Sequence, residues 1–341
     1  MTADHKVGFA VVGLGNIAQG YVLPAFANCK NATLVAVVSR EKEKAQRLAQ
    51  KFNAKFPYQN SDYHACLSNP EVEAVYIATP NGTHEEFTLR AAAAGKHVLC
   101  EKPLAATPQQ AQQMVETCDR HGVLLMTAYR KYYEPSSVYL KSLVQAGELG
   151  DVDMIQTSFS ELYRPGVSPE WLIDEVLAGG GPLMDLGVYC ISTSRWLVNQ
   201  LPDRVNATAW RHDRTIFKYV EEGISFAMHF ASGVKVQANS TYSVLMSSFI
   251  FVQGTNGSAM LTPAFPFEYP RHLTIQINGH DPYIKTFPVM DEFAPEIDTF
   301  AAAIREQRPV EASGLDGYRD MIIIGAIYEA ARTQRTVEIK Y

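Results

Sequence analysis

The 341-residue chain lacks the features that mark nucleic-acid-binding, membrane and secreted proteins. Its formal net charge is -6 and it contains no block of like charges, so it has no basic field to attract nucleic acid or anionic lipid. It has no apolar run long enough to span a bilayer, and its N-terminus has no secretion signal. We therefore expect a cytoplasmic protein with neither a nucleic-acid partner nor a membrane partner.

Cysteine pairs and histidine clusters are also missing. The five cysteines include no CxxC pair, and the nine histidines show no HxxxH spacing. The sequence therefore predicts neither a disulfide framework nor a metal site. No internal repeat or low-complexity linker interrupts the chain, which is 47% hydrophobic and longer than one average domain. Two packed globular domains are the natural expectation.

Apolar strands alternate with amphipathic helices in the first part of the chain. The expected strands span residues 7–13, 33–39, 74–79, 97–101 and 123–129, and the clearest helices span residues 41–52 and 107–122. Near-continuous apolar strands separated by helices are typical of a parallel sheet with helices on both faces. We therefore predict a doubly wound α/β domain over residues 1–127.

The pattern changes in residues 128–341, which we predict to form a second domain. Helices are expected at 135–147 and 182–198, then strands at 205–211, 224–230, 234–243, 248–254 and 273–278, then helices at 291–307 and 317–333. The mixed polarity and short turns of these strands indicate a mainly antiparallel sheet with one open face. We expect another copy to cover that face in a homodimer or homotetramer.

A glycine-rich turn, VVGLGNIA, follows the first expected strand and precedes a helix. In the pattern G-x-G-x-x-A, Gly13 permits the tight turn, Gly15 lets the backbone approach a pyrophosphate, and Ala18 allows close packing of helix and sheet. A tight strand-to-helix turn without a ligand is the alternative. The further βα units that follow favour a dinucleotide site, which includes Asn16 and Ile17.

The second strand ends in Ser39 and Arg40, where a chain that binds the adenosine ribose 2′-hydroxyl of NAD carries an acidic residue. Serine and arginine complement a 2′-phosphate instead, and Lys44 lies one helical turn further along. The sequence therefore predicts NADP as the cofactor. Solvated helix charges are the alternative for Arg40 and Lys44, and for Lys44 the two interpretations stay open.

The segment ATPNGTHEEF follows the third predicted strand at the ligand-binding edge of the sheet. Three of its residues are expected to line the cofactor: Thr79, Pro80 and Asn81. Thr83 and Glu86 have the spacing of a capping box. His84 is expected to be a polar residue near the cofactor rather than a catalytic base.

Lys102 ends the next strand, within the sequence EKP. An ammonium at this edge can hydrogen-bond a substrate oxygen and lower the pKa of a neighbouring group. A surface lysine paired with Glu101 is the alternative, and EKP alone does not separate the two. The peptide bond between Lys102 and Pro103 is also left open between cis and trans.

The segment AGGGPLMDLGVYC places Asp185 and Tyr189 four residues apart, which predicts that both project from one helix face after a flexible turn at residues 179–181. An aspartate that complements the helix dipole and a tyrosine that simply packs are the alternative. Because a nucleotide fold and Lys102 accompany the pair, we favour a catalytic set of Lys102, Asp185 and Tyr189.

Five motifs in this order, VVGLGNIA, ATPNGTH, EKPLA, AYRKYYEP and GGGPLMDLGVY, resemble those of the glucose-fructose oxidoreductase, inositol dehydrogenase and rhizopine catabolism protein family. The resemblance extends over essentially the whole chain. It implies a Rossmann domain followed by an α/β domain with a large open, mainly antiparallel sheet. It also implies catalytic roles for Lys102, Asp185 and Tyr189.

The resemblance further implies which residues contact ligands. On the cofactor side these are Glu101, Lys102 and Arg130, and on the substrate side Lys102, Tyr132, Tyr133, Tyr163, Asp185 and Tyr189. Many members have histidine where Tyr189 stands, whereas the glucose-fructose oxidoreductase and dihydrodiol or xylose dehydrogenase branch has tyrosine, which points to a sugar or cyclic polyol. Related sequences often have arginine where this chain has Leu172, so the cofactor contact of that arginine is not carried over.

The resulting hypothesis is an NADP-dependent oxidoreductase that oxidises the C1 hydroxyl of an aldose to a lactone. Tyr189 would accept the proton, Lys102 would stabilise the phenolate, and Asp185 would fix the substrate and the lysine. Two alternatives stay open. One is NADPH-dependent reduction of a sugar-derived ketone such as 1,5-anhydrofructose, and the other is a non-enzymatic NADP-sensing regulator on the same scaffold.

Overall fold

The computed structural model describes residues 5–341 and divides the chain into two compact units. Unit 1 comprises the residues up to Arg130 together with Asp291–Tyr318, and unit 2 comprises Lys131–Met290 and Arg319–Tyr341. The sequence-based boundary differs, because it placed all of residues 128–341 in one domain. A contiguous assignment misses the return of the chain to unit 1, which depends on contacts between residues far apart in sequence.

Unit 1 is built on a six-stranded parallel sheet with the strand order β3-β2-β1-β4-β5-β6. This is the order of a Rossmann fold, and the predicted doubly wound α/β class is confirmed. The strands are β1 (Val7–Val12), β2 (Ala32–Ser39), β3 (Phe56–Gln59), β4 (Ala74–Ile77), β5 (His97–Glu101) and β6 (Leu125–Ala128). Only β3, a short edge strand that contains Pro57, was not predicted.

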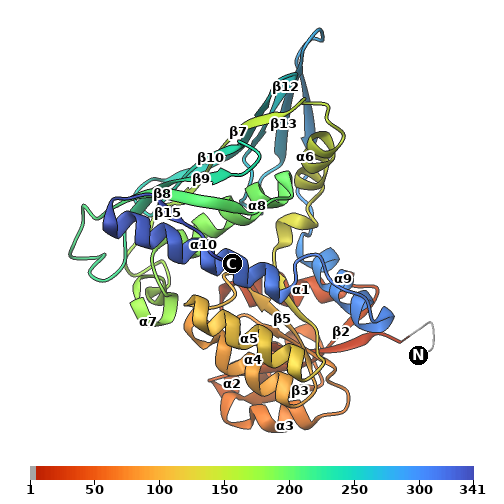
Figure 1. The fold of residues 1–341 in the computed structure, drawn as a ribbon. Coiled ribbons are helices and arrows are strands. Elements are labelled where there is room, and N and C mark those ends of the chain that lie inside the picture. Colours follow the sequence, from red (N-terminus) through yellow and green to blue (C-terminus); the bar gives the residue numbers. More distant parts are fainter. Residues whose placement is uncertain (1–4) are drawn as a thin grey trace. The chain divides into compact units, whose positions relative to one another are not determined.

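Helices connect and cover these strands (Figure 1). They are α1 (Leu23–Ala25), α2 (Lys42–Phe52), α3 (Tyr63–Ser68), α4 (His84–Ala93), α5 (Pro108–Arg120) and α9 (Phe293–Glu306). α5 begins at the Thr107 cap, whose hydroxyl accepts the backbone N–H of Gln110 at 3.2 Å. α9 belongs to unit 1 because it contacts β1, β2 and β5, and its Asp298 accepts the backbone N–H groups of Lys30 and Asn31 at 2.8 Å.

Unit 2 contains a nine-stranded sheet with the order β14-β13-β12-β11-β7-β10-β9-β8-β15. All neighbours are antiparallel except β7 and β10, which are parallel, so the predicted mainly antiparallel sheet is confirmed. The strands are β7 (Val152–Glu161), β8 (Pro202–Trp210), β9 (Gly223–Phe230), β10 (Lys235–Thr241), β11 (Met246–Gly254), β12 (Gly257–Thr262), β13 (Arg271–Ile277), β14 (Tyr283–Phe287) and β15 (Val337–Glu338).

One face of this sheet is covered by helices of unit 2. α6 (Pro135–Gln145) contacts β12 and β13, whereas α8 (Val188–Val198) contacts β7 and β10. The remaining helices are α7 (Glu175–Ala178) and α10 (Gly314–Thr333), and α10 has residues in both units. Along β10, exposed and buried residues alternate from Lys235 to Asn239, as expected for a strand with one face in the core and one face open.

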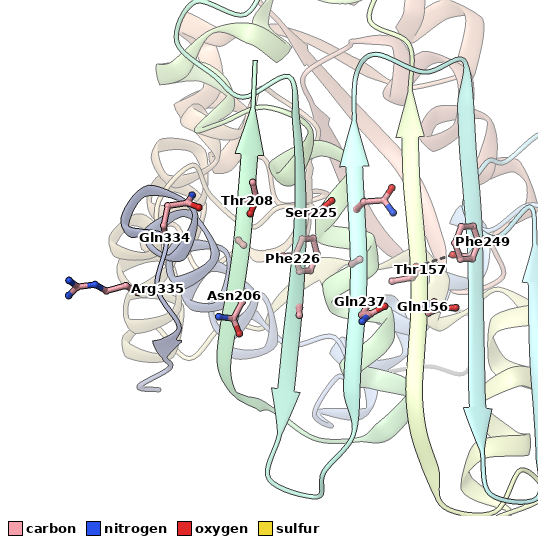
Figure 2. Close-up of a pocket in the computed structure, with 14 residues that line it drawn as sticks. Gln156, Thr157, Asn206, Thr208, Ser225, Phe226, Gln237, Phe249, Gln334 and Arg335 are labelled. Atoms are coloured by element: carbon pink, nitrogen blue, oxygen red, sulfur yellow. Dashed lines mark hydrogen bonds between the residues drawn. The ribbon is translucent and has the colours of Figure 1, made fainter. Parts of the chain in front are cut away.

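The open face forms a hollow of about 610 Å³ (Figure 2). Its lining residues come from β7, β8, β9, β10 and β11, and include Gln156, Asn206, Gln237, Asn239 and Phe249. The hollow contains neither Asp185 nor Tyr189 among its lining residues, so it is distinct from the predicted catalytic segment. Amide side chains beside an aromatic ring suit a contact with another protein surface.

Within residues 5–341, none of the helices combines the length and the apolar character needed to cross a membrane. The predicted cytoplasmic location stays a prediction.

Candidate active site

The glycine-rich loop of unit 1 has the geometry that a dinucleotide requires. Gly13 has a φ of +89°, and a Cβ atom there would lie 2.6 Å from the carbonyl oxygen of Ala78, so both the backbone and the packing demand glycine. Around Gly15, by contrast, no residue of the described part of the chain other than its sequence neighbours places an atom within 4 Å of the position that a Cβ would take. The open space above Gly15 fits a pyrophosphate that approaches the backbone closely. The following helix contains a π-turn at Ala18–Val22.

The end of β2 carries the residues predicted to bind a 2′-phosphate. Ser39 is buried, and its Oγ accepts the backbone N–H of Glu41 at 3.2 Å. Because this oxygen acts as an acceptor there, the hydroxyl can still donate its own hydrogen to another group. Arg40 is exposed, and Lys44 is half-buried in the first turn of α2. Arg40 and Lys44 thus project from the short connection between β2 and α2 and from the first turn of α2, not from a long loop. Such an arrangement suits recognition of an anion.

The loop after β4 positions the predicted cofactor-lining residues. Thr79 and Pro80 are half-buried and Asn81 is buried. The predicted capping box was wrong, because the cap of α4 makes no side-chain hydrogen bond. Thr83 lies in a 3₁₀ turn, and its hydroxyl points back to within 2.8 Å of the Thr79 hydroxyl and of the Pro80 carbonyl oxygen.

His84 ties this loop to the turn after β5. It is fully buried, with Nε2 2.8 Å from the carbonyl oxygen of Thr79 and Nδ1 3.1 Å from that of Pro103. Burial lowers the pKa of the imidazole. Both ring nitrogens therefore face backbone carbonyls of unit 1, one on each of the two ligand-edge loops. The cofactor contact predicted for His84 stays a prediction.

Lys102 follows β5 directly, and the Lys102–Pro103 peptide bond is cis. The neighbouring Glu101 carboxylate accepts the Tyr76 hydroxyl at 2.9 Å and the backbone N–H of Lys102 at 3.2 Å. Burial raises the pKa of Glu101, and the charge of Lys102 acts against that rise. Glu101 is therefore fixed from two sides immediately beside the predicted catalytic lysine.

Two further glutamates from α9 and its cap belong to this region of unit 1. Arg130 is buried and forms an ion pair with the equally buried Glu292. Glu296, in the first turn of α9, is fully buried. Burial raises the pKa of Glu296 well above its ordinary value, and the charge of Glu101 raises it further. No local motif connects Glu296 with β5, so the sequence pattern does not point to it.

We predict that Glu296→Gln stabilises the protein more at pH 8 than at pH 5. The raised pKa keeps the Glu296 carboxyl protonated in the folded protein, whereas the unfolded chain loses this proton near the ordinary pKa of 4.5. The free energy of unfolding therefore falls as the pH rises from 4.5 to the raised pKa of the folded protein. Over this range the unfolding constant increases by up to about tenfold per pH unit. Glutamine carries no such proton. Urea unfolding at the two pH values measures the difference.

The exposed Glu43→Gln variant is the matched control for this experiment, and its effect should be small at both pH values. An equal effect of Glu296→Gln at pH 5 and pH 8 would show that Glu296 is ionised in the folded protein.

Unit 2 carries Asp185 and Tyr189 on an irregular helix. Asp185 lies in a π-turn at Leu183–Gly187, closed by a hydrogen bond from the Val188 N–H to the Leu183 carbonyl, and Tyr189 lies in the first turn of α8. The predicted helix is therefore present, with a π-turn instead of a regular α-helical turn at Asp185, and the shared face of Asp185 and Tyr189 stays a prediction. Single π-turns inside α-helices are frequent at functional sites.

The glycines before this turn are closely packed, so the predicted flexible turn was also wrong. A Cβ atom at Gly180 would lie 2.0 Å from the Tyr328 hydroxyl, and one at Gly181 would lie 2.2 Å from the Glu221 carbonyl oxygen. The buried Glu221 carboxylate accepts the backbone N–H groups of Gly181 and Leu183, each at 3.0 Å. Glycine is needed here for close approach and not for flexibility.

The side chains of the predicted pair have well-defined surroundings. Asp185 accepts a hydrogen bond from the Tyr242 hydroxyl at 3.0 Å. Tyr189 is 6% exposed, and its ring lies 5.4 Å from that of Phe159 and 5.7 Å from that of Phe265. Phe159 and Phe265 thus pack against the Tyr189 ring within unit 2.

The tyrosines predicted to contact substrate differ in their surroundings. Tyr132 is stacked on Trp196 with ring centroids 4.6 Å apart, and its hydroxyl donates to the Ser192 carbonyl at 3.3 Å. Tyr133 is half-buried. Tyr163 is 7% exposed, and its ring packs near Tyr242. Substrate contacts of these three residues stay predictions.

A Rossmann unit with an open phosphate loop, followed by a unit with a constrained aspartate–tyrosine segment, defines a dinucleotide-dependent oxidoreductase. The family model described as oxidoreductase family, NAD-binding Rossmann fold, matches residues 7–129, and the GFO/IDH/MocA C-terminal domain matches residues 138–260. The chain belongs to the GFO/IDH/MocA oxidoreductase family, as its motifs predicted.

Several relatives are similar over almost the full chain. The D-xylose 1-dehydrogenase [NADP(+)] of Haloarcula marismortui is 30% identical and covers 98% of this chain and 94% of its own. The 1,5-anhydro-D-fructose reductase of Ensifer adhaerens is 28% identical, with coverages of 97% and 98%. The crystal structure of the aldose-aldose oxidoreductase of Caulobacter crescentus superposes with a TM-score of 0.93 at 33% identity and coverages of 98% and 100%.

Proposed function

We propose that this protein is an NADP-dependent oxidoreductase that oxidises an aldose at C1 to a lactone. The observation that carries the proposal is the constrained segment with Asp185 and Tyr189, held by Glu221 and Tyr242 in unit 2. The full-length relatives named above supply the substrate class, because two of them act on aldoses according to their names.

NADP, when bound, supplies the acceptor of the hydride. Tyr189, as its phenolate, is the proposed acceptor of the C1 hydroxyl proton, and Lys102 is proposed to stabilise that phenolate through its ammonium charge before the transfer. A phenol has an ordinary pKa near 10, so it needs a neighbouring positive charge to act as a base at neutral pH. Asp185 is proposed to hold the sugar by a charged hydrogen bond.

The preference for NADP rests on Ser39 and Arg40, and on the NADP named for the xylose dehydrogenase relative. We predict that Arg40→Ala weakens NADP binding by roughly 1.5 to 3 kcal/mol, because one charged hydrogen bond to the 2′-phosphate is lost. NAD binding should hardly change. Calorimetric titration with both cofactors measures the two affinities, and equal losses for NAD and NADP would contradict the prediction.

A kinetic assay separates this function from its alternatives. We expect NADP reduction, followed by absorbance, with at least one member of a panel of aldoses that includes xylose and glucose. The Ensifer adhaerens relative favours a second candidate, reduction of 1,5-anhydrofructose with NADPH, which the same assay detects in reverse. Tight NADP binding without turnover of any sugar or ketone would instead support a regulatory protein.

We further propose that a second copy covers the hollow on the open sheet face, in a homodimer or homotetramer (Figure 2). The hollow combines the half-buried Phe249 ring with amide side chains that can pair across an interface. Light scattering of the purified protein should give a mass of two or four chains. A mass of one chain at micromolar concentration would contradict this assignment.

A further inference from the structure

Tyr242 is held rigidly at the end of β10. Its backbone N–H donates to the Glu222 carbonyl at 2.9 Å, and its own carbonyl accepts the Tyr163 N–H at 2.8 Å. Its side chain is 3% exposed, with its ring centroid 6.0 Å from that of Tyr163 and 6.2 Å from that of Phe217. Both the backbone and the ring are therefore fixed by neighbours within unit 2.

The hydroxyl of Tyr242 is a permanent hydrogen-bond donor. It donates to Oδ2 of Asp185 at 3.0 Å. Burial raises the pKa of Tyr242 well above its ordinary value, and the charge of Asp185 raises it further. The nearby Glu221 and Tyr328 act in the same direction. The hydroxyl consequently keeps its proton at neutral pH.

The backbone around Asp185 is fixed separately from its side chain. Glu221 accepts the N–H groups of Gly181 and Leu183, and it also accepts the Tyr328 hydroxyl at 3.0 Å. These contacts fix the start of the π-turn, but none of them touches the Asp185 carboxylate. The direction of that carboxylate therefore depends on its own partners, of which the Tyr242 hydroxyl is one.

We propose that Tyr242 is a positioning residue of the reaction, whose hydroxyl holds the Asp185 carboxylate in one rotamer so that Asp185 meets the sugar in a single orientation. This inference rests on the proposed function of Asp185. Reacting groups lose much of their effect when they are displaced by a fraction of an ångström, so a residue that fixes one of them affects turnover without touching the substrate.

The test is Tyr242→Phe, which removes only the hydroxyl and keeps the ring contacts with Tyr163 and Phe217. We expect kcat to fall roughly tenfold to a hundredfold, the range for a hydrogen bond to a charged group, while the KM for the sugar changes little. Calorimetric NADP affinity should be unchanged. The matched control is Tyr341→Phe, which removes a 2.9 Å hydrogen bond to the Pro202 carbonyl within unit 2 and should leave kcat unchanged.

A double-mutant cycle with Asp185→Ala separates positioning from a general effect on packing. If Tyr242 acts through Asp185, then Tyr242→Phe should have almost no effect on kcat/KM in the Asp185→Ala background, measured by single-turnover absorbance where steady-state turnover is too slow. An equal loss in both backgrounds would overturn the proposal, as would wild-type kcat in the single variant. A Tyr242→Phe protein that fails to fold would also overturn it, because the hydroxyl would then be a requirement of the fold.

The failure of the proposed function gives a different result. A wild-type protein that binds NADP and turns over no sugar or ketone would overturn both the function and the inference. Turnover by wild type, with loss in Asp185→Ala and none in Tyr242→Phe, would overturn the inference alone.

Discussion

Replacing Tyr189 by phenylalanine is expected to reduce kcat for the best sugar by about a hundredfold to ten-thousandfold, the range that general acid–base catalysis contributes. The change removes the proposed proton acceptor, and the ring keeps its contacts with Phe159 and Phe265. NADP affinity should be unaffected, since Gly13, Gly15 and Arg40 lie in unit 1. Steady-state kinetics and calorimetric NADP titration measure the two effects.

Two controls protect this experiment. Tyr63→Phe removes the hydroxyl that donates to the Phe87 carbonyl, a buried tyrosine contact of unit 1, and should cost far less turnover. The melting temperature of Tyr189→Phe should stay close to that of wild type, because phenylalanine preserves the packed ring. Near-wild-type turnover by Tyr189→Phe would assign the proton transfer to Asp185 or to Lys102, and the roles proposed here would have to be exchanged.

The strands of both units were predictable where their composition was apolar or regularly alternating. β7 was missed because it carries Thr157 and Ser158 at buried positions. Each of these polar groups is satisfied by another strand: Thr157 donates to the Phe249 carbonyl at 3.0 Å, and Ser158 donates to Asn239 at 2.8 Å. Burial of polar side chains is permitted by partners from other strands, which a local pattern does not reveal.

The site residues show the same contrast between local sequence patterns and contacts that are distant in sequence. Gly13 and Gly15 were found because tight turns and phosphate approach leave a local signature in sequence. Glu221, Tyr242 and Glu296 were missed because their partners lie far away along the chain: the Tyr242 hydroxyl bonds to a residue 57 positions earlier, and Glu221 bonds to Gly181, 40 positions earlier. The groups that orient a site are fixed by tertiary contacts, whereas the groups that perform chemistry more often stand in short motifs.

The π-turn at Leu183–Gly187 begins with backbone groups that a tertiary contact satisfies. The sequence favours a helix that starts at Pro182, and the first N–H groups of any helix have no partner within it. Glu221 accepts the N–H groups of Gly181 and Leu183. The backbone before Asp185 is therefore bound to another part of unit 2, a contact that no local pattern reveals.

The remaining large effect concerns Lys102, whose charge is proposed to act on Tyr189. Lys102→Met removes the ammonium and keeps most of the side-chain volume, and we expect kcat/KM for sugar oxidation to fall about a hundredfold or more. In the residual activity, the pH at which oxidation rises should move upward, because a phenol without a neighbouring cation loses its proton only at higher pH. A pH profile of kcat/KM measures this shift.

The combination of both changes gives the sharpest test of their mutual dependence. If Lys102 serves to activate Tyr189, the Lys102→Met, Tyr189→Phe double variant should be little slower than the slower single variant, since removing the charge costs nothing once the phenol is gone. Losses that multiply would show that the lysine acts on the substrate independently of the tyrosine. An unshifted pH profile in Lys102→Met would lead to the same conclusion, with the lysine itself then donating or accepting the proton.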